Sequence, residues 1–297
     1  MQQHPTQLDK RRVRSAFDQA AGAYDAAAIL QREVADRTLE RLAIIRSAPR
    51  TILDVGAGTG YCSRALAGRY AKSRVVLLDV APRMLQQARA GGRLWDRLRQ
   101  RFAYVGGDAE ALPLADASVD LIFSNLTLQW CVDLDRVFAE FRRVLAPGGL
   151  LMFTTFGPDT LKELRECWAR VDGFTHTNAF LDMHDIGDAL VRAQFADPVM
   201  DMESLTVTYP DAVGLMRDLK QIGAHNATAG RARGLTGRGR WQRLVEAYEE
   251  YRREGVLPAT HEVVYGHAWA PEHGTVQHRE GELTTISLGQ LRSSLRR

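Results

Sequence analysis

The chain has few of the features that mark several large classes of protein. It has only three cysteines, Cys62, Cys131 and Cys167, which lie far apart, so neither a disulfide framework nor a zinc cluster is predicted. We expect buried free thiols in a reducing compartment. No window approaches the roughly 18 apolar residues of a membrane span, and residues 1–27 are polar and charged. We therefore expect a cytoplasmic protein that does not cross a membrane.

A large excess of charge of one sign is also missing. The 297 residues include 39 basic and 36 acidic side chains, which gives a formal net charge of +3. A field this weak does not predict a nucleic acid or a membrane surface as partner, so any basic partner site must be local. The hydrophobic content of 45% is enough for one large core.

Short apolar strands alternate with amphipathic helices between residues 51 and 156. The expected strands are RTILDV, SRVVLLDV, RFAYVGGD, SVDLIFSNL and LLMFTTF, the last of them after a turn at APGG. Near-continuous apolar strands alternating with helices predict an α/β fold, a doubly wound parallel sheet covered on both faces. Ligands of such sheets bind beyond the carboxyl ends of the strands.

The segments on either side of this pattern are more helical. We expect an N-terminal helical lid over residues 1–48, broken near AGAYDAA, with an apolar stripe at Ile29, Val34, Leu39, Leu42 and Ile45. The main domain is expected over 49–271, with helical cover insertions at about 157–195 and 210–256, and a polar, mobile tail over 272–297.

The stretch ILDVGAGTG places a glycine-rich turn directly after the first strand of the sheet. Such a turn lets the backbone approach a ligand closely and points amide N–H groups at it. Gly56, Gly58 and Gly60 follow the spacing G-x-G-x-G, whereas the dinucleotide fingerprint G-x-G-x-x-G would need glycine at Tyr61. This difference disfavours a nicotinamide oxidoreductase, and the loop has no lysine for a P-loop.

Two acids follow the next two strands. Asp79 ends the second strand, where a carboxylate can accept hydrogen bonds from a ribose diol. Asp108 follows the third strand in the sequence GGDAEAL. Each acid also has a purely structural alternative, since Asp79 could cap the next helix and Gly-Asp is common in turns.

The segments LDVGAGTG, GDAEALPLADASVDLIFSNLTLQW and RVLAPGGLLMFTTF together resemble class I S-adenosylmethionine-dependent methyltransferases. The resemblance implies a Rossmann-like fold and S-adenosyl-L-methionine as cofactor. It implies that the glycines hold the methionine part, that Asp79 binds the ribose and that Asp108 reads the adenine amino group. The cofactor-binding residues expected on this basis are Gly56, Ala57, Gly58, Gly60, Asp79, Val80, Met84, Asp108, Ala109, Glu110, Asn125 and Leu126.

Further segments, among them SAFDQAAGAYDAAAILQREVA and LMRDLKQIGAHNATAGRARGLTGR, resemble the malonyl-[acyl-carrier protein] O-methyltransferase family of biotin synthesis. The resemblance implies methylation of the free carboxylate of a malonyl thioester, carried by acyl carrier protein or by coenzyme A. VTYPDAVGLMRDLKQIGAHN and LPATHEVVYGHAW also resemble a related complex I assembly factor that is thought to hydroxylate arginine. The sequence thus leaves two functions open, methylation of a malonyl carboxylate and hydroxylation of arginine.

A malonyl carboxylate is ionised at neutral pH, so its methylation needs no general base, and no metal is expected. It needs groups that orient the carboxylate. The positioning candidates are Tyr24, Gln129, Trp130, His225 and Asn226, with His176, Asn178 and Lys220 as further candidates. Because carrier proteins are acidic, a local basic patch would attract one. That expected patch consists of Arg217, Lys220, Arg231, Arg233, Arg238 and Arg240, followed by Arg243.

Overall fold

The computed structural model describes residues 8–92, 101–231, 234 and 236–272. The expected mobile tail lies outside these residues apart from Glu272, as does Arg233 of the expected basic patch. Within the described part of the chain, no helix is both long enough and apolar enough to cross a lipid bilayer.

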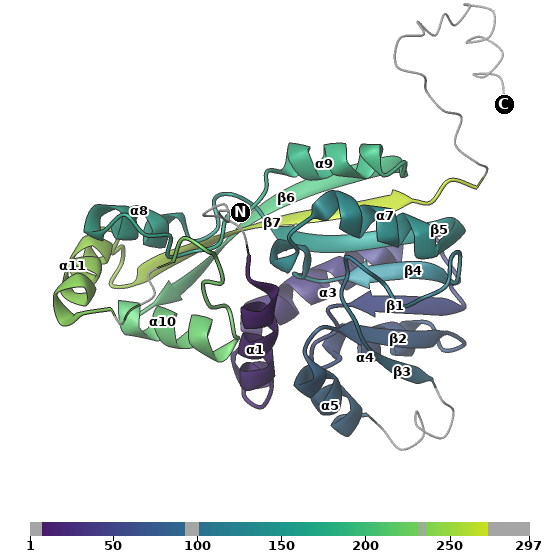
Figure 1. Cartoon of the computed structure of the whole chain (residues 1–297), viewed down its shortest axis with the longest axis horizontal. Helices are drawn as coiled ribbons and strands as arrows, with labels where there is room; N and C mark the ends of the chain where they lie inside the picture. The colour runs from purple at the N-terminus through teal and green to yellow at the C-terminus, as the bar shows by residue number, and fades with distance from the viewer. Residues whose placement is uncertain (1–7, 93–100, 232–233, 235, 273–297) are drawn as a thin grey trace, which may run out of the picture.

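A seven-stranded sheet forms the centre of the molecule, in the order β3-β2-β1-β4-β5-β7-β6 (Figure 1). The five strands from β3 to β5 are parallel, and β7 is antiparallel to both β5 and β6. The carboxyl ends of β1, β2 and β4 therefore meet at one edge of the sheet. The strands are β1 (Thr51–Val55), β2 (Arg74–Asp79), β3 (Phe102–Gly106), β4 (Val119–Ser124), β5 (Leu145–Phe156), β6 (Ala196–Tyr209) and β7 (Leu257–Trp269).

Helices cover both faces of the sheet, and several begin at capping residues. Asp9, Asp133, Asp182 and Asp211 each accept a backbone N–H at a helix start, and Pro82 opens another helix at its first turn. The helices are α1 (Lys10–Ala20), α2 (Tyr24–Ala27), α3 (Ile29–Ile44), α4 (Tyr61–Arg69), α5 (Pro82–Ala90), the 3-10 helix η1 (Leu128–Trp130), α7 (Leu134–Val144), α8 (Lys162–Val171), α9 (Met183–Arg192), α10 (Ala212–Gln221) and α11 (Arg238–Glu249).

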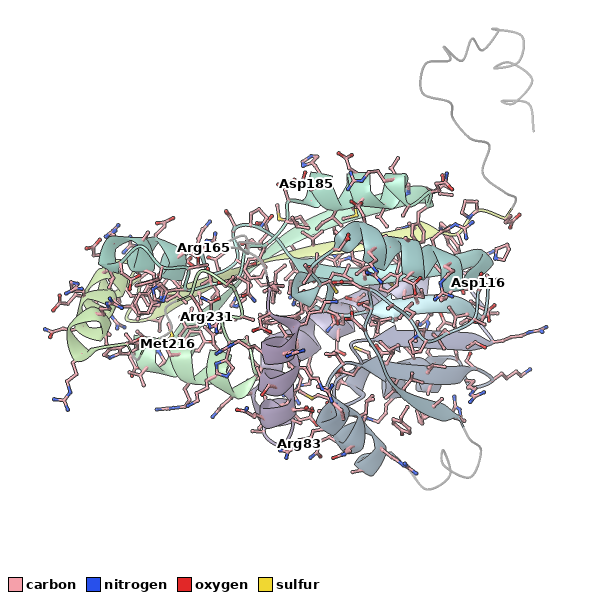
Figure 2. All side chains as sticks on the ribbon, in the orientation of Figure 1. Arg83, Asp116, Arg165, Asp185, Met216 and Arg231 are labelled. Atoms are coloured by element: carbon pink, nitrogen blue, oxygen red, sulfur yellow. The ribbon has the colours of Figure 1, made fainter. Side chains whose placement is uncertain are left out.

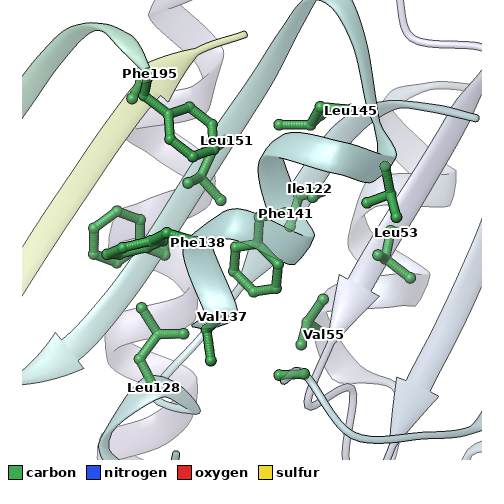
Figure 3. Close-up of a cluster of buried hydrophobic side chains, with 14 of the residues drawn as sticks. Leu53, Val55, Ile122, Leu128, Val137, Phe138, Phe141, Leu145, Leu151 and Phe195 are labelled. Carbon is green, nitrogen blue, oxygen red and sulfur yellow. The ribbon is translucent and has the colours of Figure 1, made fainter. Parts of the chain in front are cut away.

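The largest hydrophobic cluster lies between α7 and one face of the sheet (Figure 3). Phe138 is fully buried at its centre, with its ring centroid 5.5 Å from that of Phe153 and 6.3 Å from that of Phe195. Truncation of such a side chain to alanine costs about 3–5 kcal/mol. This packing holds β4 and β5 rigidly, and with them the residues that follow these strands.

The outer halves of β6 and β7 extend beyond the parallel strands and carry a second layer of helices. Helices α8, α10 and α11 gather around this end of the sheet, on the left of Figure 1. Their own cluster includes Trp168, Leu215, Leu244 and Tyr248, all of them buried. The Tyr248 hydroxyl donates to the carbonyl of Pro258 at 2.7 Å, which ties α11 to β7.

Several details differ from the sequence predictions. The sequence pattern predicts Ile29 in the apolar stripe of α3. In the structure Ile29 is 69% exposed, because the first turn of α3 borders a cavity. The expected turn at APGG lies inside β5, which already pairs at Leu145 with Val119 before a register shift. Gly148, at φ +73°, accommodates this irregularity. Cys131 is half-buried rather than fully buried.

Candidate cofactor and substrate site

The glycine-rich turn adopts a backbone that other residues rarely adopt. Gly56, Gly58 and Gly60 have φ values of +69°, +53° and +82°. At Gly56 a Cβ atom would lie 2.0 Å from the Thr127 Oγ1 atom, so only glycine fits there. The amide of Gly56 donates to the carbonyl of Leu78 at 2.8 Å, which joins the turn to β2. The turn is thus a rigid cradle of bare backbone at the sheet edge.

Asp79 lies directly beside this cradle. Its carboxylate accepts N–H groups from Gly58 at 2.9 Å and from Ala81 at 2.8 Å. Burial raises the pKa of Asp79 to about 6, against the opposing effect of these hydrogen bonds. The carboxylate still has lone pairs free, so it can accept the hydroxyl groups of a ribose.

Asp108 and Glu110 meet a cation that the sequence analysis did not single out. The Lys10 Nζ atom lies 2.6 Å from the Asp108 Oδ2 atom and 2.7 Å from the Glu110 Oε2 atom. Burial lowers the pKa of Lys10, but hydrogen bonds to the two carboxylates outweigh it and raise the pKa overall. The Glu110 amide already donates to the Asp108 Oδ1 atom at 3.0 Å.

Gly56, Asp79, Asp108 and Lys10 line one cavity at the carboxyl ends of the strands. Nine of the expected cofactor-binding residues lie on its wall, whereas Ala57, Gly60 and Glu110 do not. Asn125 is held in place, since it donates to the carbonyl of Gln31 at 3.0 Å and accepts from Thr154 at 2.9 Å. The nine are Gly56, Gly58, Asp79, Val80, Met84, Asp108, Ala109, Asn125 and Leu126.

A second, larger cavity of about 810 Å³ adjoins the first. Phe17, Tyr24, Leu126 and Trp130 line both cavities and so form their common wall. The rings of Phe17 and Trp130 meet edge to face, with centroids 5.2 Å apart. Burial, followed by the nearby charge of Asp79, raises the pKa of Tyr24, so its hydroxyl stays protonated and can donate a hydrogen bond.

The second cavity is lined by all five positioning candidates. Gln129 donates to the carbonyl of Leu126 at 2.7 Å and accepts from Thr155 at 3.2 Å, which leaves one amide hydrogen free. The side-chain amide of Asn226 makes more hydrogen bonds within the fold. It donates to the carbonyl of Thr175 and accepts two hydrogen bonds from Thr228.

The basic side chains that line the second cavity include Arg37, which is paired with Glu33 and Glu203. Lys220 and His225 are exposed there. Burial, followed by the charges of Lys220 and Arg12, lowers the pKa of His225. His176 and Asn178 also line the cavity, and the His176 ring stacks on Trp168 with centroids 3.6 Å apart.

Some side chains of the expected basic patch already interact with other groups of the protein. Arg231 (Figure 2) donates to the carbonyl of Thr228 at 2.9 Å, and Arg240 lies 3.7 Å from the Asp172 carboxylate. Arg217 and Arg238, in contrast, are exposed. Together with Lys220, they are the members that a partner could reach most easily.

Sequence reasoning missed Lys10, Phe17, Thr127 and His261, each of which lines at least one of the two cavities. Lys10 lies on the polar side and Phe17 on the apolar side of a helix expected to act as a lid. This position is only a weak sequence signal that either residue borders a ligand site. Thr127 follows the fourth strand, where ligand residues are expected. His261 lies within a strand, and nothing in its local sequence marks it as a cavity residue.

Comparison with known proteins agrees with this geometry. The family model described as "Methyltransferase domain" matches residues 53–153. The YcgJ protein of Bacillus subtilis superposes with a TM-score of 0.57 at 14% identity, over 80% of this chain and 100% of that chain. Phosphoethanolamine N-methyltransferase 2 of Haemonchus contortus, solved with S-adenosyl-L-methionine, gives 0.52 at 19% identity, over 86% and 57%. The fold and the site define a class I methyltransferase.

Relatives with higher sequence identity show which family of methyltransferases the chain belongs to. A malonyl-[acyl-carrier protein] O-methyltransferase of Laribacter hongkongensis is 57% identical over 267 residues, which cover 89% of this chain and 90% of the relative. The chain belongs to the malonyl-[acyl-carrier protein] O-methyltransferase family. This membership supports the carboxylate reading of the sequence over the arginine hydroxylase alternative.

Proposed function

We propose that the protein transfers the methyl group of S-adenosyl-L-methionine to the free carboxylate of malonyl-[acyl-carrier protein]. The cofactor supplies an electrophilic methyl group on a positively charged sulfur. A carboxylate oxygen attacks that methyl carbon with a lone pair, the carbon–sulfur bond breaks, and a neutral methyl ester and a neutral thioether result. Because opposite charges are consumed, the reaction is favoured in a pocket that excludes water.

The common wall of the two cavities is the observation that carries this proposal. The glycine turn and Asp79 would hold the cofactor, which would supply the methyl group to a ligand in the adjoining cavity. Phe17, Tyr24, Leu126 and Trp130 line both spaces, so a carboxylate in the larger cavity would lie next to a cofactor in the smaller one. The residues in the first cavity fit the cofactor through the bare backbone at Gly56 and the buried acceptor at Asp79.

The positioning candidates then have different roles in substrate binding. Tyr24 and the free amide hydrogen of Gln129 donate hydrogen bonds to the malonyl carboxylate near the methyl group. Trp130 closes the wall and keeps water out. Asn226 holds the loop that bears His225 and does not contact the carboxylate. No residue needs to take a proton, since the carboxylate is ionised above its pKa of roughly 3 to 4.

The carrier protein docks at the rim of the second cavity in this proposal. Arg217, Lys220 and Arg238 provide the positive charge that attracts an acidic partner. The acyl group enters the cavity on its thioester arm. Malonyl-coenzyme A, which presents the same thioester without the protein, is accepted with a higher KM. The enzyme then acts in the cytoplasm and needs neither nucleic acid nor a membrane.

Substrate analogues test the role of the carboxylate. Formation of S-adenosylhomocysteine should depend on malonyl-carrier protein and should be absent with acetyl-carrier protein, which lacks the carboxylate. Tyr24→Phe should lower kcat/KM with the malonyl substrate by roughly 10–150-fold, the value of one hydrogen bond to a charged group. Equal turnover with acetyl-carrier protein would show that the methyl acceptor is not the carboxylate.

A further inference from the structure

The floor of the second cavity carries a buried histidine. His261 lies in β7 opposite Leu205 of β6, and its side chain is only 6% exposed. It lines the cavity together with the apolar side chains of Phe156, Leu161 and Leu164. The ring centroids of His261 and Phe156 are 5.7 Å apart. His261 thus brings a buried titratable side chain to this cavity wall.

The hydrogen bonding of His261 fixes which ring nitrogen is free. Its Nδ1 atom lies 3.1 Å from the carbonyl oxygen of Ala259, which can only accept, so Nδ1 carries the proton. The Nε2 atom is therefore an acceptor with a free lone pair. Within the described residues Nε2 has no hydrogen-bond partner, although the ring is more than nine-tenths buried. Nε2 is not fully enclosed by protein atoms, so it stays open to the cavity and can accept a hydrogen bond from a ligand there.

The ring is also neutral near physiological pH. Burial lowers the pKa of His261 to about 4. A neutral ring with its lone pair toward the cavity repels a carboxylate, so the malonyl carboxylate belongs elsewhere, at the wall formed by Tyr24 and Trp130. The part of the substrate that passes His261 must instead bring an N–H or O–H group.

We infer that His261 Nε2 accepts a hydrogen bond from a secondary amide N–H of the pantetheine-type arm that carries the acyl thioester. This inference rests on the proposed function and adds a specificity element to it. Carrier proteins and coenzyme A hold acyl groups on an arm whose secondary amides follow the thioester. With the carboxylate at the methyl group and the arm leading to the rim, an amide passes along the cavity floor. His261 is thus a positioning residue that selects an amide-bearing thioester.

The test combines a change in the protein with a change in the substrate. One substrate is the malonyl thioester of N-acetylcysteamine, which has a secondary amide, and the other is the same compound methylated on the amide nitrogen, which has no donor. The native protein should show about 10-fold higher kcat/KM with the first, the value of one buried hydrogen bond. In His261→Phe this preference should fall below about 2-fold, and in His261→Gln, which keeps an acceptor, most of it should return.

His267 provides a matched control on the same strand. It lines neither cavity, so His267→Phe should keep the 10-fold preference. An equal rate with both thioesters in the native protein would overturn the inference, as would a preference that persists in His261→Phe. If His261→Phe does not fold, His261→Leu takes its place: loss of the preference in that variant supports the inference, and a preference that persists counts against it. Failure to methylate either thioester would count against the proposed function instead.

Discussion

The Lys10 Nζ atom at the start of α1 lies 2.6 Å from the carboxylate of Asp108, and both side chains line the cofactor cavity. The same segment also reaches the substrate side, since the amide of Asp9 donates to the carbonyl of Ala227 at 2.9 Å. Residues 8–10 thus connect the expected adenine site with the loop that borders the second cavity. The N-terminal helices are tied to both ligand sites by specific bonds.

Loss of the lysine contacts should loosen α1. In Lys10→Met, the amides of α1 should exchange hydrogen about 5-fold faster, because the partly exposed contacts with Asp108 and Glu110 are together worth about 1 kcal/mol. Arg14→Met is the matched control on the same helix, since Arg14 is exposed and 4.0 Å from Asp18. Equal exchange in the two variants would show that the Lys10 contacts do not hold the helix.

Gly56→Ala should damage both stability and cofactor binding. The new Cβ atom would overlap Thr127 Oγ1, and the backbone at φ +69° would be strained, for a cost of roughly 2–5 kcal/mol. Thermal unfolding and cofactor titration measure the two effects. Gly58→Ala, with φ +53° but open space around the new Cβ atom, should cost only about 1 kcal/mol. Similar losses at both positions would mean that the contact with Thr127 is unimportant.

The buried carboxyl of Asp54 should make stability depend on pH. Burial raises its pKa to about 7, against a hydrogen bond from the Ser63 hydroxyl. Between its unfolded value of about 4 and pH 7, the folded protein keeps a proton that the unfolded chain has released. The free energy of unfolding therefore falls as the pH rises through this window.

Asp54→Asn removes this penalty. The variant should be more stable than the native protein at pH 8 by more than about 1 kcal/mol, and the difference should vanish near pH 4. Chemical denaturation of both proteins from pH 4 to pH 8 measures it. A variant that is less stable at pH 8 would show that the ionised Asp54 is well solvated in the fold.

The exposed arginines should matter only for the carrier protein. Arg217→Glu with Arg238→Glu should raise the KM for malonyl-carrier protein by about 10-fold or more, and added salt should weaken this difference. The KM for the N-acetylcysteamine thioester should stay unchanged. Arg74→Glu, at the exposed start of β2 and thus at the opposite edge of the sheet, is the control. An unchanged KM for the carrier protein would place its docking surface elsewhere.

The cofactor cavity could be predicted from the sequence because its residues directly follow strands. Gly56, Asp79 and Asp108 each lie at the end of a parallel strand, and the fold brings these ends together whatever the rest of the chain does. Hydrophobic periodicity also predicted the helices of the cover, although it did not predict where these helices pack in the fold.

The second cavity depends on contacts that local patterns do not contain. His261 becomes part of its floor because β7 pairs with β6 and sets it opposite Leu205. Lys10 reaches Asp108 across 98 positions of sequence. Ile29 fits an apolar stripe but borders the cavity, since periodicity cannot distinguish a core from a substrate cavity.

Location of the transferred methyl group tests the central claim most directly. Malonyl-carrier protein is incubated with the purified protein and cofactor bearing a deuterated methyl group, and the acyl arm is analysed by fragmentation in a mass spectrometer. The account predicts a labelled methyl ester on the distal carboxyl of the malonyl group, removable by mild base. A label on any other atom of the substrate, or cofactor binding without label on the carrier protein, would contradict it.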